Sequence, residues 1–91
     1  MTLSELKQAN EGWFSRGNKK FFGDVSYKVL HSKKTGKPYL IRSTYAWSDM
    51  FGQPKRLHYR INTIKEDSTI GNLIANIFSD IYAVKDWLKE N

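Results

Sequence analysis

Alternation between apolar and polar residues in the middle of the chain is the feature that most constrains its fold. The stretches 25–30, 39–47 and 55–64 each follow a two-residue period, which is typical of strands with one buried side. The segments SKKTGKP (32–38) and SDMFGQP (48–54) separate them and have the composition of turns. Because short turns join antiparallel neighbours, the pattern predicts a three-stranded antiparallel meander.

Helical patterns flank the predicted strands. Thr2 followed by Glu5 forms a capping box and predicts a short helix over 2–10. Asp67, Ser68 or Thr69 can cap a second, long helix. Its apolar positions step by four and three residues and are Ile70, Ile74, Ile77, Ile81, Val84 and Leu88. We therefore expect one α+β domain over 1–91, ordered α-β-β-β-α, with the sheet packed on the long C-terminal helix.

The positive charge of the chain is concentrated in its centre. Residues 16–65 contain twelve Lys and Arg against two Asp, a net charge of +10. Residues 1–15 carry a net charge of −1 and residues 66–91 a net charge of −3, so the whole chain carries +6. Such asymmetry favours a polyanionic partner.

The third predicted strand places the charge on one face of the sheet. If Leu57, Tyr59 and Ile61 point inward, the residues between them point outward. Lys28 and Arg42 join this outer face if the register is suitable. With the basic turns, the predicted contact residues are Lys28, Lys33, Lys34, Lys37, Arg42, Lys55, Arg56, His58, Arg60 and Asn62, and the rim residues are Arg16, Lys19 and Lys20.

Three interpretations of this face remain open. It contacts nucleic-acid phosphates, with Arg or Asn available for a base edge. It binds another acidic partner, such as a host protein. Alternatively, it has no partner and is the solvated face of an antiparallel sheet, which is polar by necessity.

The residues needed for catalysis and for metal binding are scarce. The chain has no cysteine and two histidines, His31 and His58, and its central fifty residues contain only Asp24 and Asp49 as acids. These residues do not form a metal-ligand, nucleophile or phosphate-loop motif. We expect a protein that is not an enzyme and has no cofactor and no metal. Without an apolar spanning segment or an export signal, we expect a cytoplasmic location and no membrane partner.

The aromatic stretch GWFSRGNKKFFGD (12–24) has two interpretations. Trp13, Phe14 and at least one of Phe21 and Phe22 anchor the N-terminal segment on the core. Alternatively, Phe21 or Phe22 stacks on nucleic-acid bases, with Lys19 and Lys20 alongside. Further along the chain, Tyr82 and Trp87 are candidates for a homodimer seam on the C-terminal helix.

Two resemblances are carried by short motifs. The chain resembles a group of short phage and prophage proteins of unassigned function, which implies a phage-type origin. The matching positions are Gly12, Trp13, Phe14, Ser15, Phe21, Phe22, Ser43, Thr44, Tyr59, Arg60 and Ile61. The α-β-β-β-α order also resembles the double-stranded-RNA-binding domain, whose second helix begins with basic residues, whereas DSTIGNLIAN contains none.

Three functional hypotheses follow from the sequence. The first is a small basic, non-enzymatic binding protein that contacts nucleic-acid phosphates through its sheet face and turns. The second is a host-takeover or anti-defence (anti-CRISPR-like) inhibitor that docks on a host nucleic-acid-processing protein. The third is an oligomeric accessory protein that uses the C-terminal helix.

Overall fold

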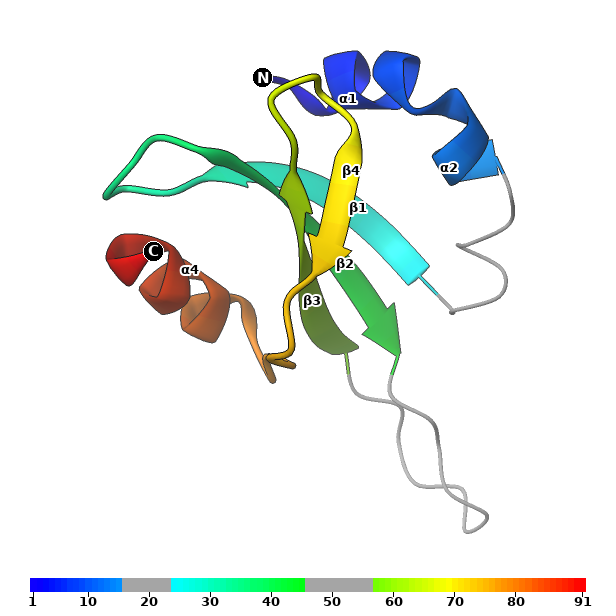
Figure 1. The fold of residues 1–91 in the computed structure, drawn as a ribbon. Helices are drawn as coiled ribbons and strands as arrows, with labels where there is room; N and C mark the ends of the chain where they lie inside the picture. Colours follow the sequence, from blue (N-terminus) through cyan, green and yellow to red (C-terminus); the bar gives the residue numbers. More distant parts are fainter. Residues whose placement is uncertain (16–23, 46–56) are drawn as a thin grey trace, which may run out of the picture.

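The computed structural model describes residues 1–15, 24–45 and 57–91, in which four strands form one antiparallel sheet (Figure 1). The strands are β1 (Asp24–His31), β2 (Pro38–Tyr45), β3 (Leu57–Ile64) and β4 (Ile70–Leu73), and each lies beside the next in the chain. The helices are α1 (Leu3–Ala9), α2 (Glu11–Ser15) and α4 (Ile81–Glu90). The predicted α+β class is confirmed, and a fourth strand extends the predicted three. The predicted turn over 48–54 lies outside the described residues.

The fourth strand occupies residues that the sequence pattern assigned to a helix. Ile70 lies opposite Ile64, and Leu73 lies opposite Asn62. The β3–β4 turn is closed by two backbone hydrogen bonds: the Lys65 amide donates to the Thr69 carbonyl at 2.8 Å, and the Ser68 amide donates to the Lys65 carbonyl at 2.9 Å. Ser68 adopts a left-handed φ of 69°. Gly71 passes so close to the Thr63 hydroxyl that a Cβ atom there would overlap it. A tight turn and a close backbone approach thus override the helical spacing of the isoleucines.

The C-terminal helix begins eleven residues later than Ile70, at Ile81. The Asp80 side chain caps it by accepting a hydrogen bond from the Ala83 amide at 2.8 Å. Before the helix, the chain stays extended along β3, where Tyr59 and Phe78 exchange two backbone hydrogen bonds of 2.8 and 2.9 Å. The predicted long helix that starts at 67–69 is therefore wrong in its first half. It is confirmed only over the ten residues of α4.

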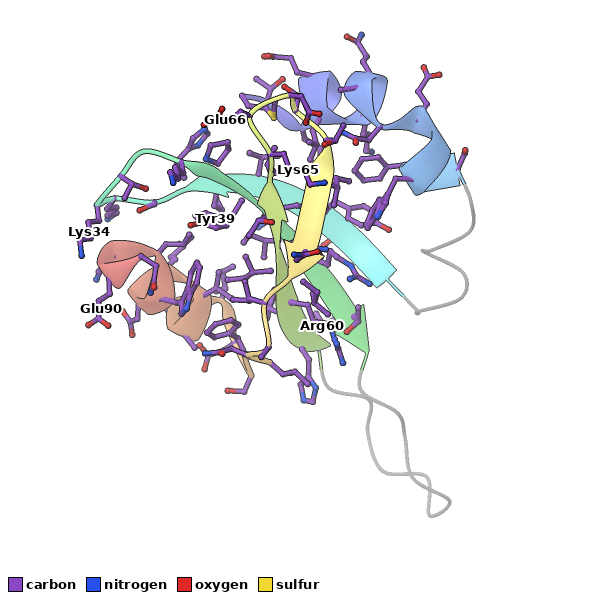
Figure 2. The ribbon with its side chains drawn as sticks, viewed as in Figure 1. Lys34, Tyr39, Arg60, Lys65, Glu66 and Glu90 are labelled. Carbon is purple, nitrogen blue, oxygen red and sulfur yellow. The ribbon has the colours of Figure 1, made fainter. Side chains whose placement is uncertain are left out.

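The main apolar core lies between α4 and one face of the sheet. Its buried members are Ile41, Ile61, Phe78, Val84 and Leu88. The Trp87 ring packs edge-on against Tyr39 at 5.2 Å and against Phe78 at 6.4 Å, measured between ring centroids. In Figure 2 the labelled Tyr39 lies between the sheet and α4. This confirms the predicted inward orientation for Tyr59 and Ile61, whereas Leu57, at the start of β3, is exposed.

The N-terminal helices cover the opposite face of the sheet (Figure 1). Leu6 of α1 and Leu40 of β2 are completely buried there. Asn10, which ends α1, donates to the carbonyls of Leu6 and Ser68 at 2.9 and 2.7 Å and accepts from the Ile70 amide at 3.1 Å. The predicted helix over 2–10 is confirmed as α1, with Thr2 as its N-cap. The sheet therefore has a helical cover on both faces, which differs from the predicted open outer face.

Candidate nucleic-acid interface

The register of the strands divides the predicted cationic face between the two sides of the sheet. Arg42 lies opposite Tyr27 on one neighbouring strand and opposite Arg60 on the other. Lys28 lies opposite Ile41, which belongs to the core beneath α4. Because opposed residues share a face, Lys28 and Arg42 lie on opposite sides of the sheet. The expectation that they share a face is wrong.

Arg42 and Asn62 are buried under α2 rather than displayed to a partner. Each exposes 6% of its surface. The Arg42 guanidinium donates to Asn62 Oδ1 at 3.3 Å and lies 5.7 Å from the centre of the Trp13 ring. Asn62 Nδ2 in turn donates to the Gly71 carbonyl at 3.3 Å. A buried guanidinium requires hydrogen-bond acceptors around it, and Asn62 supplies one. Through these contacts the two predicted contact residues connect α2, β2, β3 and β4.

His58 and Arg60 are half-buried on the face of the sheet that carries Arg42, near the start of β3. Arg60 lies opposite Arg42, and His58 lies opposite Thr44. Figure 2 shows Arg60 at the end of the sheet where β2 finishes and β3 starts. Neither side chain forms a hydrogen bond or ion pair with a described residue. Arg60 is therefore placed to receive an anion, whereas Arg42 is not.

Three lysines lie in the turn between β1 and β2. We call Lys33, Lys34 and Lys37 the basic turn. Buried Ser32 organises it: its hydroxyl accepts from the Lys34 and Thr35 amides at 3.1 and 3.0 Å. Gly36 takes the left-handed φ of 76° that the turn requires. The Lys33 amide donates to the Leu88 carbonyl at 3.0 Å and so fixes the turn on the end of α4.

The three side chains of the basic turn are exposed, as is Lys28 on the same hairpin. None of these four lysines forms an ion pair with a described residue. The ion pair found among the described residues joins Lys89 and Asp86 of α4 at 3.6 Å. Figure 2 places Lys34 at the tip of the hairpin and Glu90 at the end of α4 below it. The exposed predicted cations are thus concentrated on the β1–β2 hairpin.

Several predicted site residues lie outside the described residues. These are Arg16, Lys19, Lys20, Phe21, Phe22, Lys55 and Arg56. The predicted stacking role of Phe21 or Phe22 and the basic second turn therefore stay predictions.

A groove that the sequence did not indicate lies between the N-terminal helices and β1. It is lined by Lys7, Gln8, Glu11, Phe14, Ser15 and Tyr27. Trp13, Phe14 and Tyr27 form an aromatic cluster whose ring centroids are 4.9 to 6.0 Å apart. Trp13 and Phe14 thus fasten the N-terminal segment to the sheet through Tyr27, but on the face opposite the α4 core where the sequence pattern placed them. The alternation over 25–30 predicts the strand that carries Tyr27, but it does not indicate which helix packs against that strand.

Two other kinds of site were sought in the same residues. Over 1–15, 24–45 and 57–91, no three His, Asp or Glu side chains come close enough together to hold a metal ion. None of the described helices has the length and apolar character needed to cross a membrane.

Comparison of the chain with models of known protein families, with curated proteins and with solved structures finds no match. The resemblance to phage proteins therefore stays a prediction.

Proposed function

We propose that this protein binds the phosphate backbone of a nucleic acid through the β1–β2 hairpin, without catalysing a reaction. The contacts are made by the basic turn and by Lys28, and Arg60, on the other face of the sheet, adds a separate contact at its far end. The same proposal includes a cytoplasmic setting, in the host cell if the protein is encoded by a phage.

One observation carries the proposal. The described segments from Ser26 to Tyr45 and from Leu57 to Ile64 contain six cations, of which only Arg42 is buried, and no carboxylate. A surface that serves only for solubility mixes both signs of charge, whereas phosphate binding requires one sign. The six are Lys28, Lys33, Lys34, Lys37, Arg42 and Arg60.

The rigidity of the basic turn also supports phosphate binding. Its backbone is held by Ser32 on one side and by the Leu88 carbonyl on the other. Lysines on a fixed turn lose less conformational entropy on binding than lysines on a loose one. The hairpin is therefore suited to follow a backbone rather than to read bases.

The salt dependence of binding tests the proposal. For contacts to about five to eight phosphates, we expect the logarithm of the affinity to fall with log salt concentration at a slope of roughly −4 to −7. The triple variant Lys33→Gln, Lys34→Gln, Lys37→Gln should make that slope about 2 to 3 units shallower. Fluorescence anisotropy with a labelled oligonucleotide at several salt concentrations measures both.

A matched variant controls for net charge. The triple variant Lys65→Gln, Lys85→Gln, Lys89→Gln removes the same number of exposed lysines, so both variants fall from +6 to +3 in formal charge. We expect the control to keep most of the wild-type slope. Equal slopes for the two variants, or no binding by the wild type at low salt, contradict the proposal.

A protein partner is the second candidate, favoured by exposed apolar side chains near the start of α4. Leu73, Ile77 and Tyr82 expose 42%, 54% and 73% of their surfaces. Interfaces draw much of their affinity from a few such anchors, and tyrosine is common among them. An inhibitor that docks on a host protein would keep a stoichiometric partner after nuclease treatment. It would lose that partner in the double variant Ile77→Ser, Tyr82→Ser.

A further inference from the structure

The groove between the N-terminal helices and β1 has the volume of a small-ligand site. It measures about 610 Å³ and is largely open to solvent, and small-molecule sites are ~300–1,000 Å³ in volume. Lys7 and Gln8 come from the last turn of α1, Glu11, Phe14 and Ser15 come from α2, and Tyr27 comes from β1. The groove therefore combines an aromatic floor with a polar wall.

The aromatic floor is fixed in position from behind. The Phe14 and Tyr27 rings meet edge to face, with centroids 5.0 Å apart and planes at 88°. Trp13 packs against both, at 4.9 and 6.0 Å, and its own ring is covered by the buried Arg42 guanidinium at 5.7 Å. Phe14 and Tyr27 both remain partly exposed. A partly exposed ring whose position is fixed by neighbouring rings offers a preformed stacking surface.

The polar wall has both hydrogen-bond donors and hydrogen-bond acceptors that are not used within the described residues. Lys7 Nζ lies 5.8 Å from the Phe14 ring centre, and Lys7 and Glu11 line the same groove without forming an ion pair. The side chains of Gln8 and Glu11 form no hydrogen bond with another described residue. An ammonium, an amide and a carboxylate thus lie beside the aromatic floor, each with free donors or acceptors.

We infer that this groove takes a single unstacked nucleobase of a single-stranded nucleic acid, with guanine preferred. Single strands are recognised by bases that stack on aromatic rings and bond through their Watson–Crick edges. Only guanine presents two adjacent N–H donors for a carboxylate, which Glu11 supplies, next to an oxygen acceptor for Lys7. The inference deepens the proposed function and rests on it, because the hairpin lysines hold the strand while the groove selects the base.

Oligonucleotide binding tests the preference. We compare an eight-nucleotide U-rich single strand with the same strand carrying one central G, at fixed salt. We expect the G-containing strand to bind on the order of tenfold more tightly, as one stacked and hydrogen-bonded base allows. Equal affinities of the two strands overturn the inference while leaving phosphate binding intact. Failure to bind either strand overturns the proposed function as well.

Glu11→Gln is the informative substitution, because Glu11 is exposed and its loss does not disturb the core. We expect it to abolish most of the G-over-U ratio and to leave binding of the U-rich strand unchanged or slightly stronger. Glu66→Gln is the matched control: it removes one exposed carboxylate outside the groove, in the β3–β4 turn, and should keep the ratio. A ratio that survives in Glu11→Gln contradicts the inference.

A direct readout avoids any dependence on oligonucleotide affinity. Guanosine monophosphate and uridine monophosphate carry the same phosphate and differ only in the base. In NMR titrations we expect the guanine nucleotide to shift the Gln8 side-chain amide and the Phe14 and Tyr27 ring signals, and the uridine nucleotide to leave them in place. Equal shifts at these three residues, or shifts confined to the basic turn, overturn the assignment of a base site to the groove.

Discussion

The face of the sheet under α4 is packed mainly with aliphatic and aromatic side chains, whereas the face under α1 and α2 buries charged and polar side chains beside Leu6 and Leu40. Ile41 and Ile61 point toward α4 and contact Val84 and Leu88. Their chain neighbours Arg42 and Asn62 point the other way and are almost as deeply buried. Two adjacent residues of the same strand thus contribute to two different kinds of core.

The difference between the faces is one of directionality. Apolar burial depends mainly on area and tolerates small shifts, whereas a buried polar group must find its partner at hydrogen-bonding distance. Within the described residues every buried side-chain nitrogen and oxygen has such a partner. The face under α4 is therefore suited to stability, and the face under α1 and α2 to a fixed geometry, which is the face that borders the groove.

The largest effect is expected on the apolar face. Ile61→Ala removes a fully buried side chain and leaves a cavity beneath α4. We expect a loss of about 3 kcal/mol in the free energy of unfolding, which lowers the melting temperature by roughly 12–24 °C in a chain of this size. Urea denaturation and thermal melting measure it. A loss below about 1 kcal/mol would show that this face is not the main source of stability.

A smaller effect is expected one residue further along β3. Asn62→Ala removes an acceptor from the buried Arg42 guanidinium and a donor to the Gly71 carbonyl. A lost bond to a charged group costs about 2 kcal/mol. Asn72→Ala is the matched control, since Asn72 is exposed and should change stability by less than about 0.5 kcal/mol. Equal unfolding midpoints for the two variants contradict the polar character of this face.

The strands were predictable from the sequence because alternation of apolar and polar residues is typical of a strand with one buried and one more polar side. β1, β2 and β3 lie where the two-residue period placed them, within the described residues. The start of the C-terminal helix was not predictable in the same way. Ile70, Ile74, Ile77 and Ile81 fit a helical period, but the first three lie on an edge strand and an extended segment. Spacing alone does not weigh the turn at Ser68 or the close approach of Gly71.

The site was predictable only in its charge. The acid-free central segment can be counted from the sequence, and the basic turn is exposed as its composition suggests. Which cations are buried depends on the packing of α2 against Tyr27 and Arg42, a contact between residues far apart in the chain. The groove depends on the same contact. No local pattern reports it, because periodicity describes one element at a time.

The smallest expected effect concerns the turn that attaches the N-terminal helices to the sheet. Hydrogen bonds from the Thr69 hydroxyl, and then from the Thr69 amide, lower the pKa of Asp67 from its ordinary value of 3.8. The same turn presents the Ser68 carbonyl to Asn10. Because the carboxyl has a lower pKa in the folded protein than in the unfolded one, its contribution to stability is complete above the ordinary value. That contribution disappears as the pH falls through the lowered one.

Asp67→Asn tests this link between the turn and the polar face. We expect the variant to be slightly less stable than the wild type at pH 6, and the difference in urea midpoint to vanish as the pH falls below 3.8 and through the lowered pKa. Glu66→Gln, the neighbouring exposed carboxyl, should show no such convergence. Hydrogen exchange at the Ile70 amide, which donates to Asn10, should report the loss before the amides of α4 do. A stability difference that is independent of pH would mean that the Asp67 side chain holds the turn without its charge, and would contradict the expected link to its lowered pKa.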